Sequence, residues 1–156
     1  MASLLNTFNI SREPVARLAT SPVVSVTRGV PLRTVLELMR DQKLGAVTVC
    51  DRGQTVGIFT ERDALRCLAE ATDLETPIGD VASPGPVTVE KKDSLAEAIS
   101  RMSYRGYRHL PLVDDDGQVV GMVDAINIIQ WLVEHFPRAV YTLPPTPDVL
   151  IEREGP

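Results

Sequence analysis

The strongest constraint on the fold of this 156-residue chain is an internal repeat. A shift of 63 residues places Leu32 on Leu95, together with the apolar residues around each. After one inserted residue Gly53 falls on Gly117, and the Asp, Gln and Val residues beside the two glycines coincide as well. Self-similarity at a fixed period indicates a duplicated structural unit. We therefore divide the chain into two copies and a tail, with the boundaries 13–70, 76–135 and 136–156.

Both copies predict the same order of elements, β-α-β-β-α. Each begins with an apolar strand, followed by a segment whose apolar residues recur at helical spacing. Two more apolar strands follow, joined by a tight turn that contains glycine, and a second helix ends the copy. Ser94 and Glu97 have the spacing of a capping box at the start of a helix. The predicted elements are 22–27, 32–39, 46–50, 54–59 and 60–70 in the first copy, and 86–90, 95–102, 109–113, 118–123 and 124–135 in the second.

Neither copy has enough apolar residues to form a stable hydrophobic core alone. We expect an α+β fold in which two tandem β-α-β-β-α repeats pack through their sheets about a pseudo-two-fold axis. The segment 71–80 is predicted to be a short linker. The proline-rich residues 136–156 predict an extended arm, because proline disfavours helix. The apolar side chains of this arm either pack on the body or on a partner, or the arm frays.

Composition and charge exclude several classes of function. Lys and Arg total 16 against 21 Asp and Glu, a net charge of −5, whereas a nucleic-acid binder needs a basic face. No apolar run approaches about 18 residues and the first residues lack the basic start of a signal peptide, so we expect a cytoplasmic protein without membrane contact. The cysteines and histidines lack metal-ligand spacing, and no nucleophile motif occurs. We therefore expect no metal, no catalytic residues and no enzyme.

One motif at the end of the first copy has the chemistry of a ligand site. The run Gly57-Ile-Phe-Thr60-Glu-Arg-Asp63 ends an apolar strand and opens a helix. A helix N-terminus attracts an anion such as phosphate, and a carboxylate in the first turn can accept hydrogen bonds from both hydroxyls of a ribose. The same two residues also suit a purely structural role, with Thr60 as the N-cap and Asp63 favouring the helix dipole.

The second copy departs from this motif, since it has Gly121-Met-Val-Asp124-Ala-Ile-Asn127. Asp124 stands where the first copy has a hydroxyl residue, and its charge would repel a phosphate at that helix start. Asn127 stands in place of the carboxylate and makes weaker, neutral hydrogen bonds. We therefore predict two unequal clefts, with the better one at Asp63.

The doubled unit, the Thr60–Asp63 motif and the run Arg108-His-Leu-Pro111-Leu-Val-Asp114 together resemble the CBS domain pair. This tandem module is named after cystathionine β-synthase and is also called a Bateman module. The resemblance covers about 120 residues. It implies a regulatory, signal-transducing module, sometimes attached to an enzyme or transporter and sometimes standing alone. Such modules bind adenosine-containing ligands in clefts between two sheets and often dimerise.

The resemblance also suggests which residues contact a ligand. Basic residues at the positions of Arg108 and His109 commonly face the phosphate of a ligand whose ribose is held by the other copy, and Arg62 would add positive charge. The plain alternative is a surface arginine and a half-buried neutral histidine. Gly45 and Ala46 are small and would leave room for a purine ring. Val26, Thr27 and Val47 would supply backbone contacts and an apolar wall beside it. The candidate ligand-contacting residues are Val26, Thr27, Gly45, Ala46, Val47, Thr60, Arg62, Asp63, Arg108 and His109.

The ligand implied by the resemblance is AMP, ADP or ATP, ahead of S-adenosylmethionine or NAD. We expect it to act as a regulator and not as a required cofactor. The expected partners are this small molecule, a second copy of the chain in a homodimer, and a further, unidentified protein. The alternative function is a dimerisation or interaction scaffold whose ligand sites are vestigial.

Overall fold

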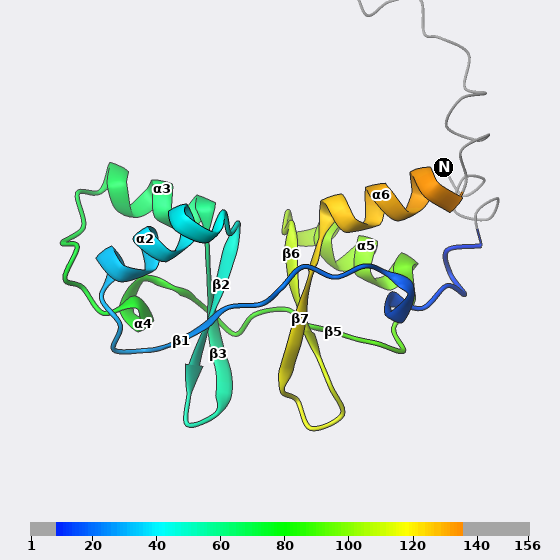
Figure 1. The fold of residues 1–156 in the computed structure, drawn as a ribbon, viewed down its shortest axis with the longest axis horizontal. Coiled ribbons are helices and arrows are strands. Elements are labelled where there is room, and N and C mark those ends of the chain that lie inside the picture. Colours follow the sequence, from blue (N-terminus) through cyan, green and yellow to red (C-terminus); the bar gives the residue numbers. More distant parts are fainter. Residues whose placement is uncertain (1–8, 136–156) are drawn as a thin grey trace, which may run out of the picture.

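The computed structural model describes residues 9–135, so the predicted arm at 136–156 lies outside the described residues. Two similar halves lie side by side, each built from a small sheet and the helices that cover it (Figure 1). The first half contains β1 (Ser25–Thr27), α2 (Leu32–Gln42), β2 (Ala46–Asp51), β3 (Gln54–Thr60) and α3 (Glu61–Ala69). The second half contains β5 (Val89–Glu90), α5 (Leu95–Arg105), β6 (His109–Val113), β7 (Val119–Asp124) and α6 (Ala125–His135).

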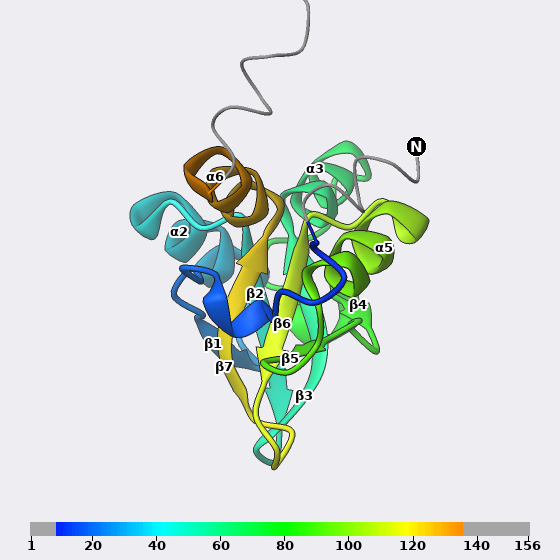
Figure 2. The same ribbon diagram turned by 90° about the vertical axis from the view of Figure 1, so that its right-hand side faces the viewer.

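The predicted α+β class and the order β-α-β-β-α are confirmed in both halves. Short elements also lead into each half: the 3-10 turn η1 (Val15–Arg17) before the first, and helix α4 (Ile78–Val81) with strand β4 (Ser83–Pro84) before the second. The predicted linker thus ends in the first residues of a helix. Within each half the first strand runs parallel to the second across a helix, and the second pairs antiparallel with the third. The hairpins β2–β3 and β6–β7 extend in the same direction, away from the helices (Figure 2).

The two halves exchange the segments that lead into them. Strand β4 pairs with β3 of the first half, where Ser83 lies opposite Ile58. In the same way Ser21, which precedes β1, forms a bridge with Met122 on β7 of the second half. Figure 1 shows this crossing as the blue coil, residues 18–24, that runs from the second half to the first.

The exchange extends into the cores. The apolar side chain of Ile78 on α4 is fully buried among the core residues of the first half. Val15 on η1 is fully buried in the core of the second half, with Ile10 and Leu18 beside it. Because each core is completed by the lead-in segment of the opposite copy, the two copies fold as one body.

The helical periodicity seen in the sequence corresponds to the buried face of each helix. Leu32, Val35 and Met39 are buried on α2, and Leu95, Ala98 and Met102 are buried at the equivalent positions of α5. The predicted capping box starts α5: Glu97 N donates to Ser94 Oγ at 3.2 Å, and Ser94 N donates to Glu97 Oε2 at 2.7 Å. In residues 9–135 we find no helix that is both long and apolar enough to cross a membrane.

Candidate ligand site between the two halves

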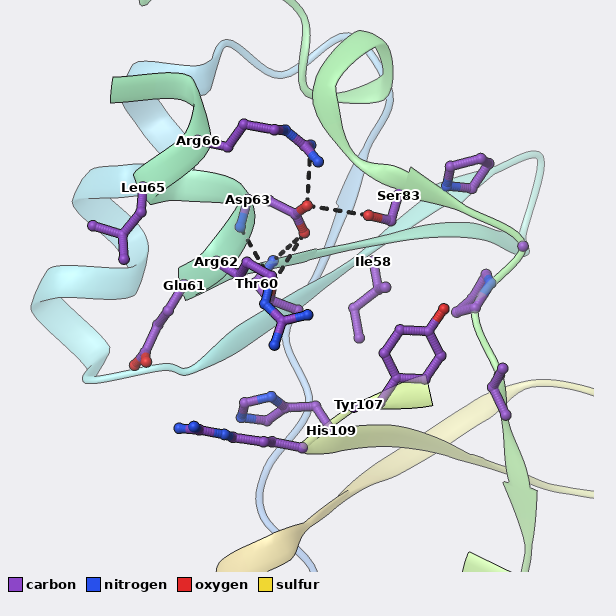
Figure 3. A pocket seen from close by; sticks show the side chains of 16 residues that line it. Ile58, Thr60, Glu61, Arg62, Asp63, Leu65, Arg66, Ser83, Tyr107 and His109 are labelled. Carbon is purple, nitrogen blue, oxygen red and sulfur yellow. Dashed lines mark hydrogen bonds and ion pairs between the residues drawn. The ribbon is translucent and has the colours of Figure 1, made fainter. Parts of the chain in front are cut away.

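A cavity of about 480 Å³ lies where the start of α3 faces the second half. Its volume falls within the range of small-molecule sites. Both halves and the exchanged segment contribute to its wall, as the close view in Figure 3 shows. The lining residues are Ile58, Thr60, Glu61, Arg62, Asp63, Leu65 and Arg66 from the first half, 83–87 from the exchanged segment, and Gly106, Tyr107, Arg108 and His109 from the second half.

Thr60 and Asp63 form the cap of α3, as one of the two interpretations of the motif predicted. Thr60 has extended backbone at the end of β3, and its Oγ1 accepts a hydrogen bond from Asp63 N at 3.4 Å. Thr60 N donates in return to Asp63 Oδ2 at 2.9 Å. This capping box satisfies two amides that the helix leaves without partners. Both residues also line the cavity, so the structural role and a role in binding coincide at one place.

The other oxygen of Asp63 also has partners. Ser83 Oγ donates to Asp63 Oδ1 at 3.1 Å, and Arg66 Nη2 lies 3.0 Å from the same oxygen. Only 4% of Asp63 is exposed, which makes it one of two buried polar residues among those described. The carboxylate therefore lies at the back of the cavity, held by α3, β3 and the exchanged strand β4 (Figure 3).

Besides Arg66, three basic residues from both halves line the cavity. Arg62 follows the cap of α3, while Arg108 and His109 lie at the start of β6. Both arginines are exposed, and within residues 9–135 neither forms an ion pair. The sequence-based grouping of Thr60, Asp63 and these three residues therefore corresponds to one cavity. Free guanidinium groups beside a helix N-terminus can attract an anion.

His109 fills the space beside Gly45. A Cβ atom built on Gly45 would lie only 2.6 Å from His109 Nε2, so a larger residue here would force the imidazole or the backbone to move. The same nitrogen, His109 Nε2, lies 3.7 Å from Asp124 Oδ1, and both side chains are 19% exposed. The imidazole, and not open space, therefore occupies the region next to Gly45 where the sequence suggested room for a purine.

The remaining predicted site residues do not line this cavity. Val26 and Thr27 are on β1, paired with Val49 and Cys50, while Ala46 and Val47 are buried on β2. None of them, nor Gly45, lines the cavity. Their contact with a ligand stays a prediction.

The apolar part of the wall comes from residues that sequence reasoning missed. Residues 84–87 and Tyr107 come from beyond the motif, and Ile58 comes from β3. A signal was present in the dipeptide Ser83-Pro84, because the first copy has Ser21-Pro22 at the same place before its first strand. Its meaning depended on the strand exchange, which no local pattern announces.

The equivalent helix start in the second half carries different groups. Ser21 Oγ donates to Asp124 Oδ2 at 2.6 Å, and Asp124 N donates to Asn127 Oδ1 at 2.8 Å. Asp124 Oδ1 is buried and forms no hydrogen bond among the described residues. This place therefore has a net negative charge at the first residue before the helix, where the first half has the neutral hydroxyl of Thr60.

Comparison with known proteins identifies the family. The CBS domain matches residues 15–70 and again 78–134, so that one domain covers each half. The chain therefore belongs to the CBS-domain family, as the resemblance predicted. Within that family it is a tandem pair, with its candidate site in the cavity between the two copies.

Three curated relatives illustrate the similarity. The CBS domain-containing protein YhcV of Bacillus subtilis is 33% identical over 105 residues, which are 67% of this chain and 74% of that protein. An uncharacterized protein of Methanopyrus kandleri is 32% identical over 111 residues, which are 67% of this chain. The chain spans only 57% of the length of that archaeal protein. A third relative is an enzyme, the arabinose 5-phosphate isomerase GutQ of Escherichia coli, of which the match covers 34%.

Solved structures show the same fold. A CBS domain protein from Pyrobaculum aerophilum complexed with AMP has a TM-score of 0.69 and 25% identity, and the match covers 78% of this chain and 98% of that one. The cytosolic domain of the Mg²⁺ channel MgtE in complex with ATP has a TM-score of 0.66 and 24% identity, with coverage of 78% and 49%. The first of these two proteins is thus known with AMP bound and the second with ATP bound.

Proposed function

We propose that this chain is a ligand-sensing module that binds an adenosine-containing nucleotide in the cavity between its halves. One observation carries the proposal: Thr60 and Asp63 of the first half face Arg108 and His109 of the second across a single cavity. A carboxylate at one end and cations at the other match a ribose and a charged tail. The AMP complex of the similar Pyrobaculum protein supports this class of ligand.

Each part of the cavity suits one part of such a ligand. Asp63 is the acceptor for ribose hydroxyls, and the N-terminus of α3 with Arg62 and Arg108 is the place for phosphate. The apolar side chains of Ile58 and Tyr107, together with residues 84–87, form a wall for the adenine ring. We propose AMP, ADP or ATP as the ligand, and S-adenosylmethionine or NAD as weaker candidates. A cytoplasmic location, where such nucleotides are abundant, stays part of this proposal.

We further propose that the chain forms a homodimer through its helices. Leu65 and Leu68 on α3 are 67% and 60% exposed, and Ile129 on α6 is 54% exposed. Exposed apolar residues gathered on two helices mark an interaction surface. A groove of about 580 Å³ with a mainly apolar wall runs between α5 and α6 in the same region. This groove is also the observation that favours the second candidate function, an interaction scaffold with vestigial ligand sites.

Titration calorimetry with AMP, ADP, ATP, NAD and S-adenosylmethionine tests the proposal. We expect at least one of them to bind the wild type, and Asp63→Asn to weaken that binding about tenfold through loss of charge-assisted hydrogen bonds. The matched control is Asp41→Asn, which removes an exposed carboxylate of α2 that lies outside the cavity. If none of the five compounds binds, the scaffold is the better interpretation. Binding that Asp63→Asn leaves unchanged would place the site elsewhere.

A further inference from the structure

The carboxylate of Asp63 accepts three hydrogen bonds and forms one ion pair. Oδ2 accepts from Thr60 N at 2.9 Å and from Thr60 Oγ1 at 3.1 Å. Oδ1 accepts from Ser83 Oγ at 3.1 Å and is paired with Arg66 Nη2 at 3.0 Å. An ionised carboxylate offers about four acceptor positions on its two oxygens. A ligand hydroxyl that binds Oδ1 therefore competes with Ser83 and Arg66 for the acceptor positions of this oxygen.

The two oxygens differ in how easily they release a donor. Both donors to Oδ2 belong to Thr60, and losing them would undo the cap of α3. On Oδ1 the hydroxyl of Ser83 can rotate away, and the Arg66 side chain is 49% exposed. Breaking the pair without a replacement would leave the buried carboxylate unpaired, so Arg66 leaves only as a ligand hydroxyl takes its place, while water solvates the released guanidinium. Oδ1 is therefore the oxygen that a ligand can reach.

Arg66 keeps a second partner when it leaves Asp63. Its Nη2 also donates to Val81 O, at the end of α4, at 3.1 Å. A guanidinium released from the carboxylate therefore stays beside the cavity wall instead of becoming fully free. This arrangement favours a simple exchange of one donor for another at Oδ1, with the cap of α3 left intact (Figure 3).

We propose that Arg66 is a specificity-determining residue that competes with the vicinal hydroxyls of the ligand for Asp63 Oδ1. The inference rests on the proposed function and adds to it. Because a ribose hydroxyl gains its bond to Asp63 Oδ1 at the expense of Arg66, the wild-type site draws less net affinity from the diol than it would without this competitor. Ser83 competes for the same oxygen in the same way. Removing either competitor raises the affinity for ligands that carry the diol and for no others.

The opposite role for Arg66 is an attractive one, in which its positive charge draws the phosphate of a nucleotide into the cavity. The two roles predict opposite changes when the charge is removed. They separate most cleanly on a neutral ligand, so the probes are adenosine, which has both hydroxyls and no phosphate, and 2′,3′-dideoxyadenosine, which has neither.

The test is calorimetric titration of both nucleosides into the wild type and Arg66→Met, which keeps the length of the stem and removes the donor. We expect adenosine to bind Arg66→Met about two- to fivefold more tightly than the wild type. The dideoxy compound should bind both proteins equally, because it never displaces Arg66. Arg33→Met, which breaks an exposed pair with Glu75 outside the cavity, should change neither.

Ser83→Ala gives a second, independent measurement, since it removes the other donor to Oδ1 and should tighten adenosine binding in the same diol-dependent way. Thermal unfolding of each variant checks that it is folded. Weaker adenosine binding to Arg66→Met, or an equal gain for the dideoxy compound, would overturn the competition while leaving nucleotide binding in place. If neither nucleoside nor AMP binds any of the proteins, the proposed function fails and the competition fails with it.

Discussion

Ser83 and Ser21 occupy equivalent positions in the two halves. Ser83 lies opposite Ile58 on β3, and Ser21 lies opposite Met122 on β7. Each hydroxyl donates to a polar side chain at the start of the last helix of the opposite copy, Ser83 to Asp63 at 3.1 Å and Ser21 to Asp124 at 2.6 Å. The exchange of lead-in strands thus places one serine at each helix start, although the acceptor differs in position along the chain.

This relationship predicts that the second helix start can be converted into a binding site. Changing Asp124→Thr together with Asn127→Asp gives it the hydroxyl and carboxylate of the first motif, with Ser21 already in place as a donor. Under the proposed function, we expect calorimetry with AMP to show nearly two binding events per chain instead of one. The double change keeps the net charge of this helix start but moves the carboxylate from the residue before the helix, where it would repel a phosphate, to the position that Asp63 has in the first half.

The control for this conversion is Asp115→Asn, which removes one negative charge from the turn between β6 and β7. It should leave the number of bound ligands unchanged. An unaltered stoichiometry in the double variant would show that the difference between the two helix starts does not decide ligand binding.

Gly45→Ala should destabilise the protein through His109. The new Cβ would lie 2.6 Å from His109 Nε2, so the imidazole or the backbone has to move. Overpacking of this kind typically costs about 1–3 kcal/mol, which urea denaturation measures. Gly29→Ala is the matched control, since no atom lies within 4 Å of the added group. If His109→Ala in the same chain fails to restore stability, the clash is not the cause.

The stability of the second half should depend on the charge of Asp93. Partial burial raises the pKa of this carboxyl, but hydrogen bonds from the Glu90 amide and the Arg101 guanidinium together outweigh it and hold the pKa below its usual range. The pKa of Asp93 is lower in the folded state than in the unfolded state, where it is about 3.9, so the ionised carboxyl stabilises the fold above that pH. This contribution is lost as the pH falls through the folded-state pKa.

We therefore expect Asp93→Asn to lower the free energy of unfolding by about 1 kcal/mol at pH 7. The difference from the wild type should shrink as the pH falls below about 4, because the wild-type carboxyl then also becomes neutral. Urea denaturation at a series of pH values measures both. A difference that stays constant across this range would mean that the charge of Asp93 is not the source of its contribution.

The proposed homodimer predicts an effect of charge on α6. Ile129 is 54% exposed and lines the groove between α5 and α6. Ile129→Asp should shift sedimentation from dimer to monomer, since an unpaired carboxylate would be buried in the interface. The control is Val120→Asp on β7, which is 47% exposed and lies outside the groove. A wild type that sediments as a monomer at all concentrations would remove the dimer from the proposal.

Local patterns predicted the elements, because helical spacing, caps and turns depend on neighbouring residues. Thr60 and Asp63 could be placed at a helix start from sequence alone, whereas only the resemblance to CBS domain pairs suggested that Arg108 and His109 face the same ligand. The partners of Asp63 could not be predicted in full. Ser83 reaches it through pairing between β3 and β4, which lie about 25 residues apart in the chain.

The same limit explains the wall of the cavity. From the sequence, we predicted that small and apolar residues of the first copy, such as Gly45 and Val47, surround a purine. The structure packs Val47 in the core of the first half and sets His109 against Gly45, while residues 84–87 line the cavity. The contact of His109 with Gly45 and the lining of the cavity by residues 84–87 arise between the copies, and such contacts leave no periodic signal in either copy.

Ile78 is buried in the core of the first half and Val15 in the core of the second, and this has a consequence for the evolution of the chain. Neither copy can be deleted, transplanted or replaced as a separate cassette, because removing one also takes a core side chain from the other. Substitutions at the crossing segments must suit the opposite copy, so the two copies are expected to vary together there while their outer helices diverge independently.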